Sequence, residues 1–210
     1  MNTLIFLRHG HSEANAKDLL TGRLPGIGLS AKGKRQALDL VERIGRTQID
    51  YLHVSPIERC QLTIDPWLRS RYASSLVEMA INDAISEIDF GTWSGRKLSN
   101  LRRQPLWRDV QNSPSTVTFP SGESFRGAQR RSHRAVLDMV AKSSNKTHLI
   151  VSHSDVIKLI SAKLLGMKLD DFQGIHISPS SFTVFTEEKG RFSLLSSNSK
   201  SSLKDLLGKR

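Results

Sequence analysis

Short apolar runs alternate with longer amphipathic stretches along most of this chain. Runs of strand length occur at residues 4–6, 51–54 and 148–151. Apolar side chains at helical spacing predict helices over residues 31–46, 97–111, 124–142 and 155–165. A further helix is expected to begin near Pro56 and to be interrupted or ended by Pro66. The alternation predicts an α/β fold, a three-layer sandwich in which helices flank both faces of a mainly parallel sheet.

The last quarter of the chain has a different pattern. Residues 181–187 and 191–196 resemble two strands joined by the turn at 188–190, which predicts a hairpin at the edge of the sheet. Residues 196–202 are polar and rich in serine, so we expect 196–210 to be a mobile polar tail that follows a single domain at 1–195. A single helical turn at 203–207, packed against the body or a partner, is the alternative.

Polar side chains follow each of the three predicted strands. Arg8 and His9 come directly after the first strand, Ser55 and Arg59 after the second, and His153 after the third. In an open α/β sheet, the carboxyl ends of the strands are where ligand crevices form. A salt-bridged arginine or a helix cap would explain any one of these residues alone. Their repetition at one topological position instead predicts a shared site.

The order and separation of these residues resemble the histidine phosphatase superfamily, which includes the cofactor-dependent phosphoglycerate mutases and many small-molecule phosphatases. The resemblance covers residues 3 to about 187, and it implies a phosphoglycerate mutase-like fold with a cap insertion at about 84–123. The motifs that carry it are Arg8-His9-Gly10 with Asn15, Ser55-Pro56 with Arg59, Glu87 before Phe90-Gly91, and Ser152-His153.

The resemblance implies a role for each central residue. His9 is expected to attack the phosphorus atom and form a phosphohistidine, since a neutral imidazole is a competent nucleophile. Arg8 and Arg59 are expected to hold the phosphoryl oxygens with their planar guanidinium groups. His153 is expected to donate a hydrogen bond to the same phosphoryl group. Glu87 is the candidate general acid for the departing alkoxide and then the base for water, which requires a raised pKa.

Five further residues are candidates for substrate binding. Asn15 matches a phosphate-contact position of the family, and Ser12 offers a hydroxyl, although an ordinary turn hydrogen bond also explains Ser12. Glu123 and Ser124 belong to a loop that borders the phosphate pocket in the family, while Ser124 also suits a helix cap. Ser154 follows His153 where many relatives carry glycine, so its side chain is expected to lie close to the phosphate.

Two reactions begin with the same attack by His9. The compact region at 84–123 and the loop Pro120 to Ser124 resemble the phosphatase branch, so we expect hydrolysis of a small phosphorylated metabolite, with phosphoglycerate mutase as the alternative. The pattern leaves sugar phosphates, nucleotides, a cobalamin precursor phosphate and phosphoproteins open as substrates. No cofactor is expected. The pair His9 and His11 lacks the carboxylates or cysteines that would complete a metal site, so no metal is expected either.

The charge of the chain raises an alternative of another class. A net charge of +11 over 210 residues is compatible with nucleic-acid binding. However, the basic residues are distributed along the chain, aromatic residues make up only 6%, and no nucleic-acid motif is present. A cationic surface also attracts phosphorylated metabolites. Nucleic acid is therefore an unlikely partner on this pattern.

The apolar stretches, the first residues and the cysteine count indicate the cellular compartment of the protein. The longest apolar stretches have strand length, so no membrane interaction is expected. The first residues lead directly into Arg8 without a long apolar segment, unlike a signal peptide. A single cysteine, Cys60, excludes an intramolecular disulfide. These features predict a cytoplasmic protein whose oligomeric state the sequence does not indicate.

Overall fold

A six-stranded sheet forms the centre of the computed structural model, which describes residues 1–208. The strand order is β4-β3-β6-β1-β7-β8. The first four of these strands run parallel to one another. Strand β7 runs antiparallel to both β1 and β8, and β7 and β8 form the expected edge hairpin. The strands are β1 (Asn2–Arg8), β3 (Tyr51–Val54), β4 (Glu78–Ile81), β6 (Thr147–Ser152), β7 (Phe182–Glu188) and β8 (Arg191–Ser199).

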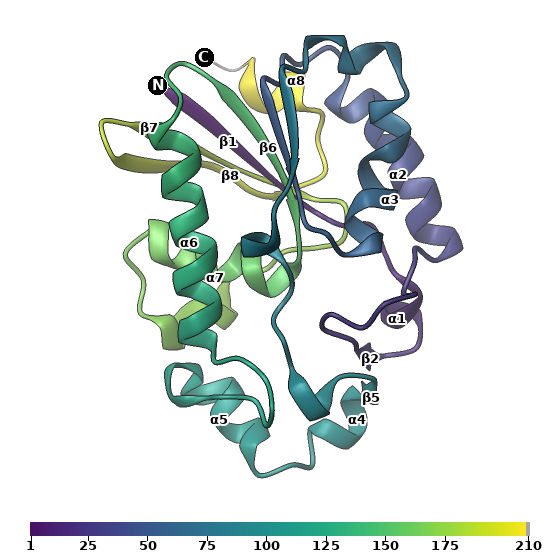
Figure 1. Ribbon diagram of the computed structural model, residues 1–210, viewed down its shortest axis with the longest axis vertical. Coiled ribbons are helices and arrows are strands. Elements are labelled where there is room, and N and C mark those ends of the chain that lie inside the picture. The colour runs from purple at the N-terminus through teal and green to yellow at the C-terminus, as the bar shows by residue number, and fades with distance from the viewer. Residues whose placement is uncertain (209–210) are drawn as a thin grey trace.

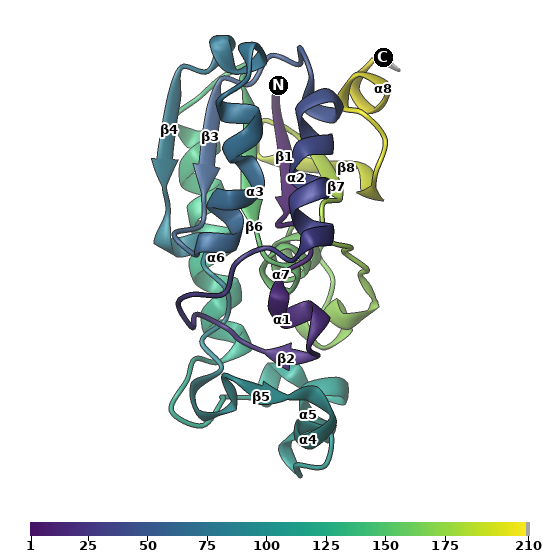
Figure 2. The same cartoon turned by 90° about the vertical axis from the view of Figure 1, so that its right-hand side faces the viewer.

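Helices cover both faces of this sheet (Figures 1 and 2). On β1, Ile5 and Leu7 pack in one apolar cluster, and Leu4 and Phe6 pack in another, because successive side chains of a strand point to opposite faces. The first cluster joins α2 (Ala31–Ile44) and α3 (Glu58–Leu68), and the second joins α6 (Phe125–Ala141) and α7 (Ser154–Leu164). The predicted three-layer architecture is confirmed.

The segment between β4 and α6 lies beyond the carboxyl ends of the parallel strands, at the lower end of Figure 1. We call residues 84–123 the cap segment. Its ring side chains Trp93 and Phe119 pack with Phe125 of α6 in a third apolar cluster. The smaller elements in and around it are α1 (Glu13–Ala16), β2 (Leu19–Leu20), β5 (Arg96–Lys97), α4 (Leu98–Leu101), α5 (Leu106–Asn112) and the 3-10 helices Asp83–Ile85, Gly91–Trp93 and Pro114–Thr116; two further 3-10 helices are Arg71–Ser75 and Leu169–Gly174.

Two predicted helices differ from the structure because of proline. The helix expected over residues 97–111 is divided into α4 and α5, since Pro105 lacks the N–H that a continuous helix needs and disfavours helical geometry at the preceding residue. Conversely, Pro66 does not end α3, which continues to Leu68. The next residue, Trp67, is fully buried in the core, and this burial holds the last turn of α3 in place.

The tail predicted to be mobile from residue 196 instead packs against the body. Residues 196–199 belong to β8, where the Asn198 side-chain oxygen accepts a hydrogen bond from the Ser178 backbone N–H at 2.6 Å. Helix α8 (Leu203–Leu207) follows, and Leu203 is fully buried in the cluster under α2. Leucines at 203, 206 and 207 give this short helix one apolar face, which outweighs the polar serines before it. Residues 209 and 210 lie outside the described residues.

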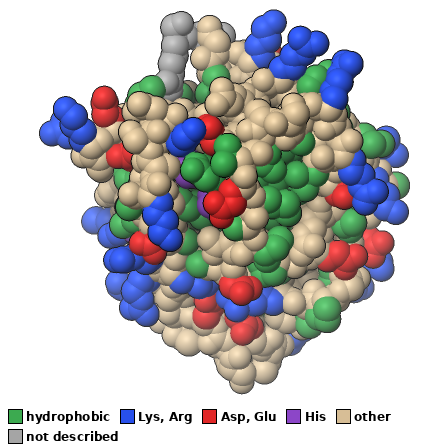
Figure 3. All heavy atoms as spheres, turned by 45° about the horizontal axis from the view of Figure 1, so that its top comes forward, with side chains coloured by type: hydrophobic (Ala, Val, Ile, Leu, Met, Phe, Trp, Pro, Cys, Tyr) green, Lys and Arg blue, Asp and Glu red, His purple; other side chains and the backbone are tan. Residues whose placement is uncertain are grey.

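Positive charge is dispersed on one face of the molecule (Figure 3), while Arg126, Arg130, Arg134 and Lys163 line one groove together. On the face seen in Figure 3, Lys and Arg side chains are spread around the periphery and are not gathered in one block. Within residues 1–208, no helix has both the length and the apolar character needed to cross a bilayer.

Candidate active site

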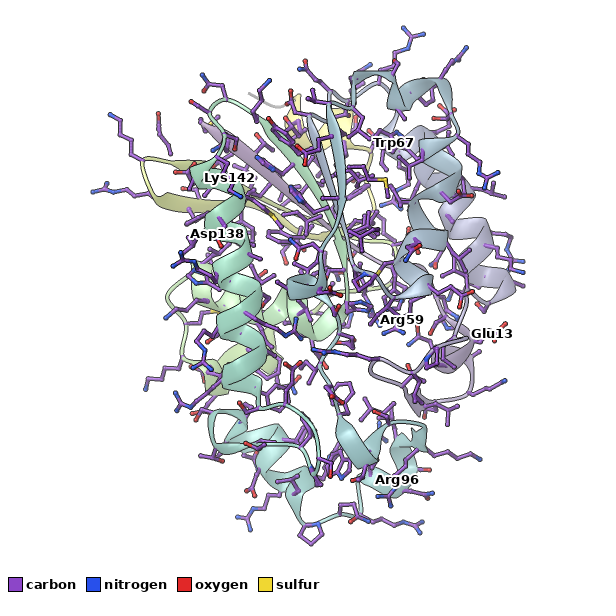
Figure 4. The ribbon with its side chains drawn as sticks, viewed as in Figure 1. Glu13, Arg59, Trp67, Arg96, Asp138 and Lys142 are labelled. Carbon is purple, nitrogen blue, oxygen red and sulfur yellow. The ribbon has the colours of Figure 1, made fainter. Side chains whose placement is uncertain are left out.

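The carboxyl ends of three adjacent strands bring the predicted catalytic residues together. β1 ends at Arg8 and is followed by His9, while β6 ends just before His153, which begins α7. β3 leads through Ser55 to Arg59 in the first turn of α3. Figure 4 shows Arg59 at the end of α3 that lies nearest the cap segment. Because β3, β6 and β1 are neighbours in the sheet, residues far apart in sequence reach one cavity.

The hydrogen bonds of His9 define which ring nitrogen is available for chemistry. Its Nδ1 lies 2.7 Å from the Gly10 carbonyl oxygen, which only accepts, so Nδ1 carries the proton. The lone pair is therefore on Nε2, which lies 3.2 Å from Nε of Arg59. Burial, followed by the positive charge of Arg59, lowers the pKa of His9 well below its usual value. Both effects keep the ring neutral and nucleophilic.

Arg8 and Arg59 are cations in a largely buried environment. Arg8 Nη1 donates to the Ile177 carbonyl at 2.6 Å, and Arg59 Nη2 donates to the Gly22 carbonyl at 2.9 Å. Within residues 1–208, the buried Nε of Arg8 and Nη1 of Arg59 have no hydrogen-bond partner. Buried donors normally find partners, and these two unpaired guanidinium nitrogens suit an anion.

His153 is fully buried and its ring centroid lies 5.2 Å from that of His9. Its Nδ1 is 3.1 Å from Arg59 Nη2 and its Nε2 is 2.8 Å from the Ser55 hydroxyl. Because a guanidinium only donates, Nδ1 accepts and Nε2 carries the proton. The expected donation from His153 to a phosphoryl group therefore requires a second proton on the ring, which burial opposes by lowering its pKa.

Glu87 lies in the same buried region, with Oε2 3.9 Å from Nδ1 of His153. Burial is the main cause that raises the pKa of Glu87 to about 7, and the negative charge of Asp155 acts in the same direction. One carboxyl oxygen also accepts the Ile88 backbone N–H at 2.9 Å. A carboxyl group with this pKa holds a proton near neutral pH and is able to release it.

Glu123 and Ser124 have positions that differ from the expected substrate contacts. Neither side chain lines the cavity that contains His9. Ser124 caps α6 by accepting the Gly127 N–H, and Glu123 forms ion pairs with Arg131 at 2.6 Å and Arg23 at 3.1 Å. Both side chains are therefore engaged by protein groups outside the cavity.

The ion pairs of Glu123 lead to the backbone of Glu87. Arg23 Nε and Arg131 Nη2 both donate to the Glu87 carbonyl oxygen, at 2.8 and 3.2 Å. Glu123 Oε1 accepts from both guanidinium groups and from the Asp89 backbone N–H. Two cations joined by one carboxylate thus hold the segment that carries the candidate acid. We call Arg23, Glu123 and Arg131 the Glu87 clamp.

Glycine makes the close packing of this segment possible. Gly91 has a φ of 51°, and a Cβ atom there would overlap the Pro120 carbonyl oxygen. A Cβ on Gly122 would likewise overlap the Asp89 carbonyl oxygen. The loop before α6 therefore lies backbone to backbone on the segment after Glu87, as only glycine permits.

The other predicted binding residues line the cavity. Ser12 and Asn15 form a reciprocal capping box at the start of α1, so the turn hydrogen bond anticipated for Ser12 is present. Ser154 begins α7, and its hydroxyl lies 3.4 Å from the Ile177 carbonyl. Asp155, which is not among the predicted binding residues, also lines the cavity. Its position in the first turn of α7, two residues after His153, is the sequence signal for it.

This cavity has a volume of about 290 Å³. A larger groove of about 690 Å³ lies between β4 and α6 and contains none of the predicted catalytic residues. Two imidazoles in that groove are hydrogen-bonded to each other, with His53 Nε2 3.2 Å from His148 Nδ1. The described residues contain no group of three or more His, Cys, Asp or Glu side chains arranged to hold a metal ion.

Comparison with known proteins identifies relatives over nearly the full length. The chain is 31% identical over 203 residues to phosphoserine phosphatase 1 of Hydrogenobacter thermophilus, covering 94% of this chain and 92% of that protein. It is 28% identical over 175 residues to a 2,3-bisphosphoglycerate-dependent phosphoglycerate mutase of Bartonella henselae, covering 80% and 84%.

Solved structures agree with these sequence relatives. A phosphoserine phosphatase from Entamoeba histolytica in complex with 3-phosphoglyceric acid superimposes with a TM-score of 0.84 at 25% identity, covering 95% of this chain and 98% of that one. The phosphoglycerate mutase-like fold expected from the sequence is thereby confirmed. The model of the histidine phosphatase superfamily (branch 1) matches residues 4–200. On its fold and on this match, the chain belongs to the histidine phosphatase superfamily.

Proposed function

We propose that the protein hydrolyses a small-molecule phosphomonoester through a phosphohistidine on His9, with Glu87 as general acid and base and without a catalytic metal. Membership of the family supports a phosphatase or a mutase. The observation that carries the proposal is the neutral His9, whose Nε2 accepts from Arg59 Nε, in a site where Arg8 Nε and Arg59 Nη1 have no hydrogen-bond partner among the described residues. A phosphate dianion is able to accept hydrogen bonds from these guanidinium N–H groups.

In the first step, the Nε2 lone pair of His9 forms a bond to phosphorus while the bond from phosphorus to the alcohol oxygen breaks. The proton of the Glu87 carboxyl group passes to that oxygen, and the alcohol leaves neutral. Arg8 and Arg59 neutralise the charge on the phosphoryl oxygens. Positioned charges of this kind supply most of the catalysis in phosphoryl transfer.

In the second step, the Glu87 carboxylate removes a proton from a water molecule as its oxygen attacks phosphorus. The bond between Nε2 and phosphorus breaks, and inorganic phosphate forms. His9 and the protonated Glu87 are then regenerated. A pKa of about 7 suits Glu87 to both roles, because neither protonation state is strongly disfavoured at neutral pH. Asp155, Asn15, Ser12 and Ser154 line the cavity around this reaction.

Phosphoglycerate mutase is the second candidate, since one of the relatives carries that name. A mutase would return the phosphoryl group from His9 to a reoriented intermediate and would exclude water. The compact cap segment favours hydrolysis.

Three measurements test the proposal. Incubation with labelled substrate should leave an acid-labile, alkali-stable label on His9, and p-nitrophenyl phosphate should be hydrolysed in the presence of a chelator. In parallel, 3-phosphoglycerate isomerisation is measured with 2,3-bisphosphoglycerate. Absence of label together with absence of turnover would reject the phosphohistidine mechanism, whereas rapid isomerisation with negligible hydrolysis would favour the mutase.

A further inference from the structure

The end of the cavity away from Arg8 and Arg59 is built from apolar side chains. Trp93 and Phe119 are almost fully buried and pack edge to face, with ring centroids 5.5 Å apart. Trp107 stacks on Trp93 with ring centroids 6.2 Å apart, is half-buried and also lines the cavity. Val110 and Leu20 add aliphatic surface to the same wall. Because these rings support one another, the wall is preformed.

The charges around the cavity are distributed unevenly. Among the described residues that line it, Arg8 and Arg59 are the only Lys or Arg side chains, and both lie with His9. The carboxylates on the wall are Glu87 and Asp155. The cap segment carries basic residues, but none of them lines the cavity. Arg96, for example, is exposed on the cap and does not line the cavity (Figure 4).

The cations that lie near the cavity without lining it are already engaged by other groups. Arg23 lies close to Glu87, but its guanidinium is already shared between the Glu87 carbonyl and Glu123. Lys158 of α7 is likewise engaged, by Asp155 at 3.7 Å and by Gln173 at 3.3 Å. A leaving group with a carboxylate would therefore lose water without gaining an unengaged cationic partner. Burying an unpaired charge is strongly unfavourable.

We propose that the substrate is the phosphate ester of an uncharged, apolar or aromatic alcohol, and that the wall formed by Trp93, Trp107, Val110 and Phe119 selects against leaving groups that carry a carboxylate. This inference rests on the proposed phosphatase function. It separates this chain from the activity named for its phosphoserine phosphatase relative. A cavity of about 290 Å³ lies at the lower end of the range for small-molecule sites, which suits one ring-sized group beside the phosphate.

The test compares substrates whose alcohols are all primary, so that leaving-group basicity differs little. The kcat/KM for 2-phenylethyl phosphate is measured beside those for O-phosphoserine, 3-phosphoglycerate and the methyl ester of 3-phosphoglycerate. We expect 2-phenylethyl phosphate to exceed 3-phosphoglycerate by at least about 10-fold, because one buried aromatic ring contributes more than about 1.4 kcal/mol. We also expect the methyl ester to exceed the free acid, since the two differ in the carboxylate charge.

A matched pair of variants tests the charge argument on one helix. Gln111 and its neighbour Asn112 are both exposed on α5, but only Gln111 lines the cavity. Gln111→Arg should raise the ratio of kcat/KM for 3-phosphoglycerate over 2-phenylethyl phosphate by about 10-fold, consistent with a hydrogen-bonded charge. Asn112→Arg adds the same charge outside the cavity and should leave the ratio unchanged.

The outcomes separate this inference from the proposed function. If phosphoserine or 3-phosphoglycerate is hydrolysed as well as 2-phenylethyl phosphate by the unaltered protein, the inference is wrong while the phosphatase function stands. An equal change of the ratio in both arginine variants also contradicts it, since steering by surface charge would then be the cause. If none of the esters is hydrolysed and His9 takes up no label, both proposals fail together.

Discussion

The two ends of the cavity are lined by different kinds of side chain, polar at one end and apolar at the other. The end proposed to bind phosphate consists of arginine and histidine side chains at the carboxyl ends of β1, β3 and β6, each held by hydrogen bonds to backbone or to a neighbouring side chain. The far end consists of ring and aliphatic side chains from the cap segment and from the β2 region. The proposed chemistry thus rests on the sheet, while the surface proposed to meet the alcohol comes from short helices joined by loops. Substitutions at the two ends should accordingly affect different kinetic parameters.

The largest effect is expected at the phosphate end. His9→Ala removes the nucleophile, and kcat for every phosphomonoester should fall by at least about 10⁴-fold, in line with the loss of a catalytic nucleophile in other enzymes. Thermal unfolding should be little changed. Turnover of p-nitrophenyl phosphate and circular dichroism would check both points. Retained turnover in a folded variant would disprove the assigned nucleophile.

Glu87→Gln removes the acid while keeping the shape of the side chain. The kcat for 2-phenylethyl phosphate should fall by about 10²–10⁴-fold, as is typical for general acid catalysis. The loss for p-nitrophenyl phosphate should be smaller in the first step, because nitrophenolate leaves without a proton. A uniform loss for both substrates would contradict the assigned acid role.

The pH dependence follows from the same residue. The raised pKa of about 7 means that the protonated form of Glu87 is lost as pH rises through about 7. For 2-phenylethyl phosphate, when the first step limits the rate, kcat should therefore decline above about pH 7. The decline should be absent in Glu87→Gln. A flat profile from pH 6 to 9 in the unaltered protein would be inconsistent with this assignment.

The Glu87 clamp should give a smaller effect, since it acts through the backbone. Glu123→Gln removes the carboxylate that joins Arg23 and Arg131, and kcat for 2-phenylethyl phosphate should fall by about 10-fold, comparable to the loss of one charged hydrogen bond. The loss should be smaller for p-nitrophenyl phosphate, which a general structural defect would not produce. Asp138→Asn is the control, because it breaks an exposed ion pair with Arg134 on α6 instead.

An effect of similar size, but on kcat/KM, is expected at the cap. Trp107→Ala should lower kcat/KM for 2-phenylethyl phosphate by about 10-fold, because part of an apolar contact is lost. Inhibition by inorganic phosphate should stay unchanged, since that anion meets only the other end. If phosphate affinity fell in parallel, the two ends would not be separable as described.

Several features of the fold could be read from local pattern, and others could not. The strand at 51–54 and the helices near 31–46, 124–142 and 155–165 have strong periodicity, and the structure contains them with small changes at their ends. β4 was missed. Its side chains are largely exposed at the edge of the sheet, so it has no buried pattern, and its pairing with β3 makes it a strand.

The candidate site shows the same division. His9, Arg8, Arg59, Glu87, Ser12, Asn15, His153 and Ser154 were expected at one site, and all eight contribute to or surround the cavity. Glu123 and Ser124 were expected to contact substrate but do not line it. The loop that carries Glu123 and Ser124 indicated that both lie near the site. Only the packed structure shows that the Glu123 carboxylate already forms ion pairs with Arg23 and Arg131.

By itself, the sequence determined the α/β architecture and placed the residues proposed to bind phosphate at strand ends, because strand periodicity and residues at strand ends are local properties of the chain. The tertiary structure decided which protonation states those groups adopt and which side chains face the alcohol. Both depend on burial and on contacts between segments distant in sequence, as the pKa of Glu87 near Asp155 and the packing of Trp93 on Phe119 illustrate. Burial and distance are properties of the folded chain, so no local pattern contains them.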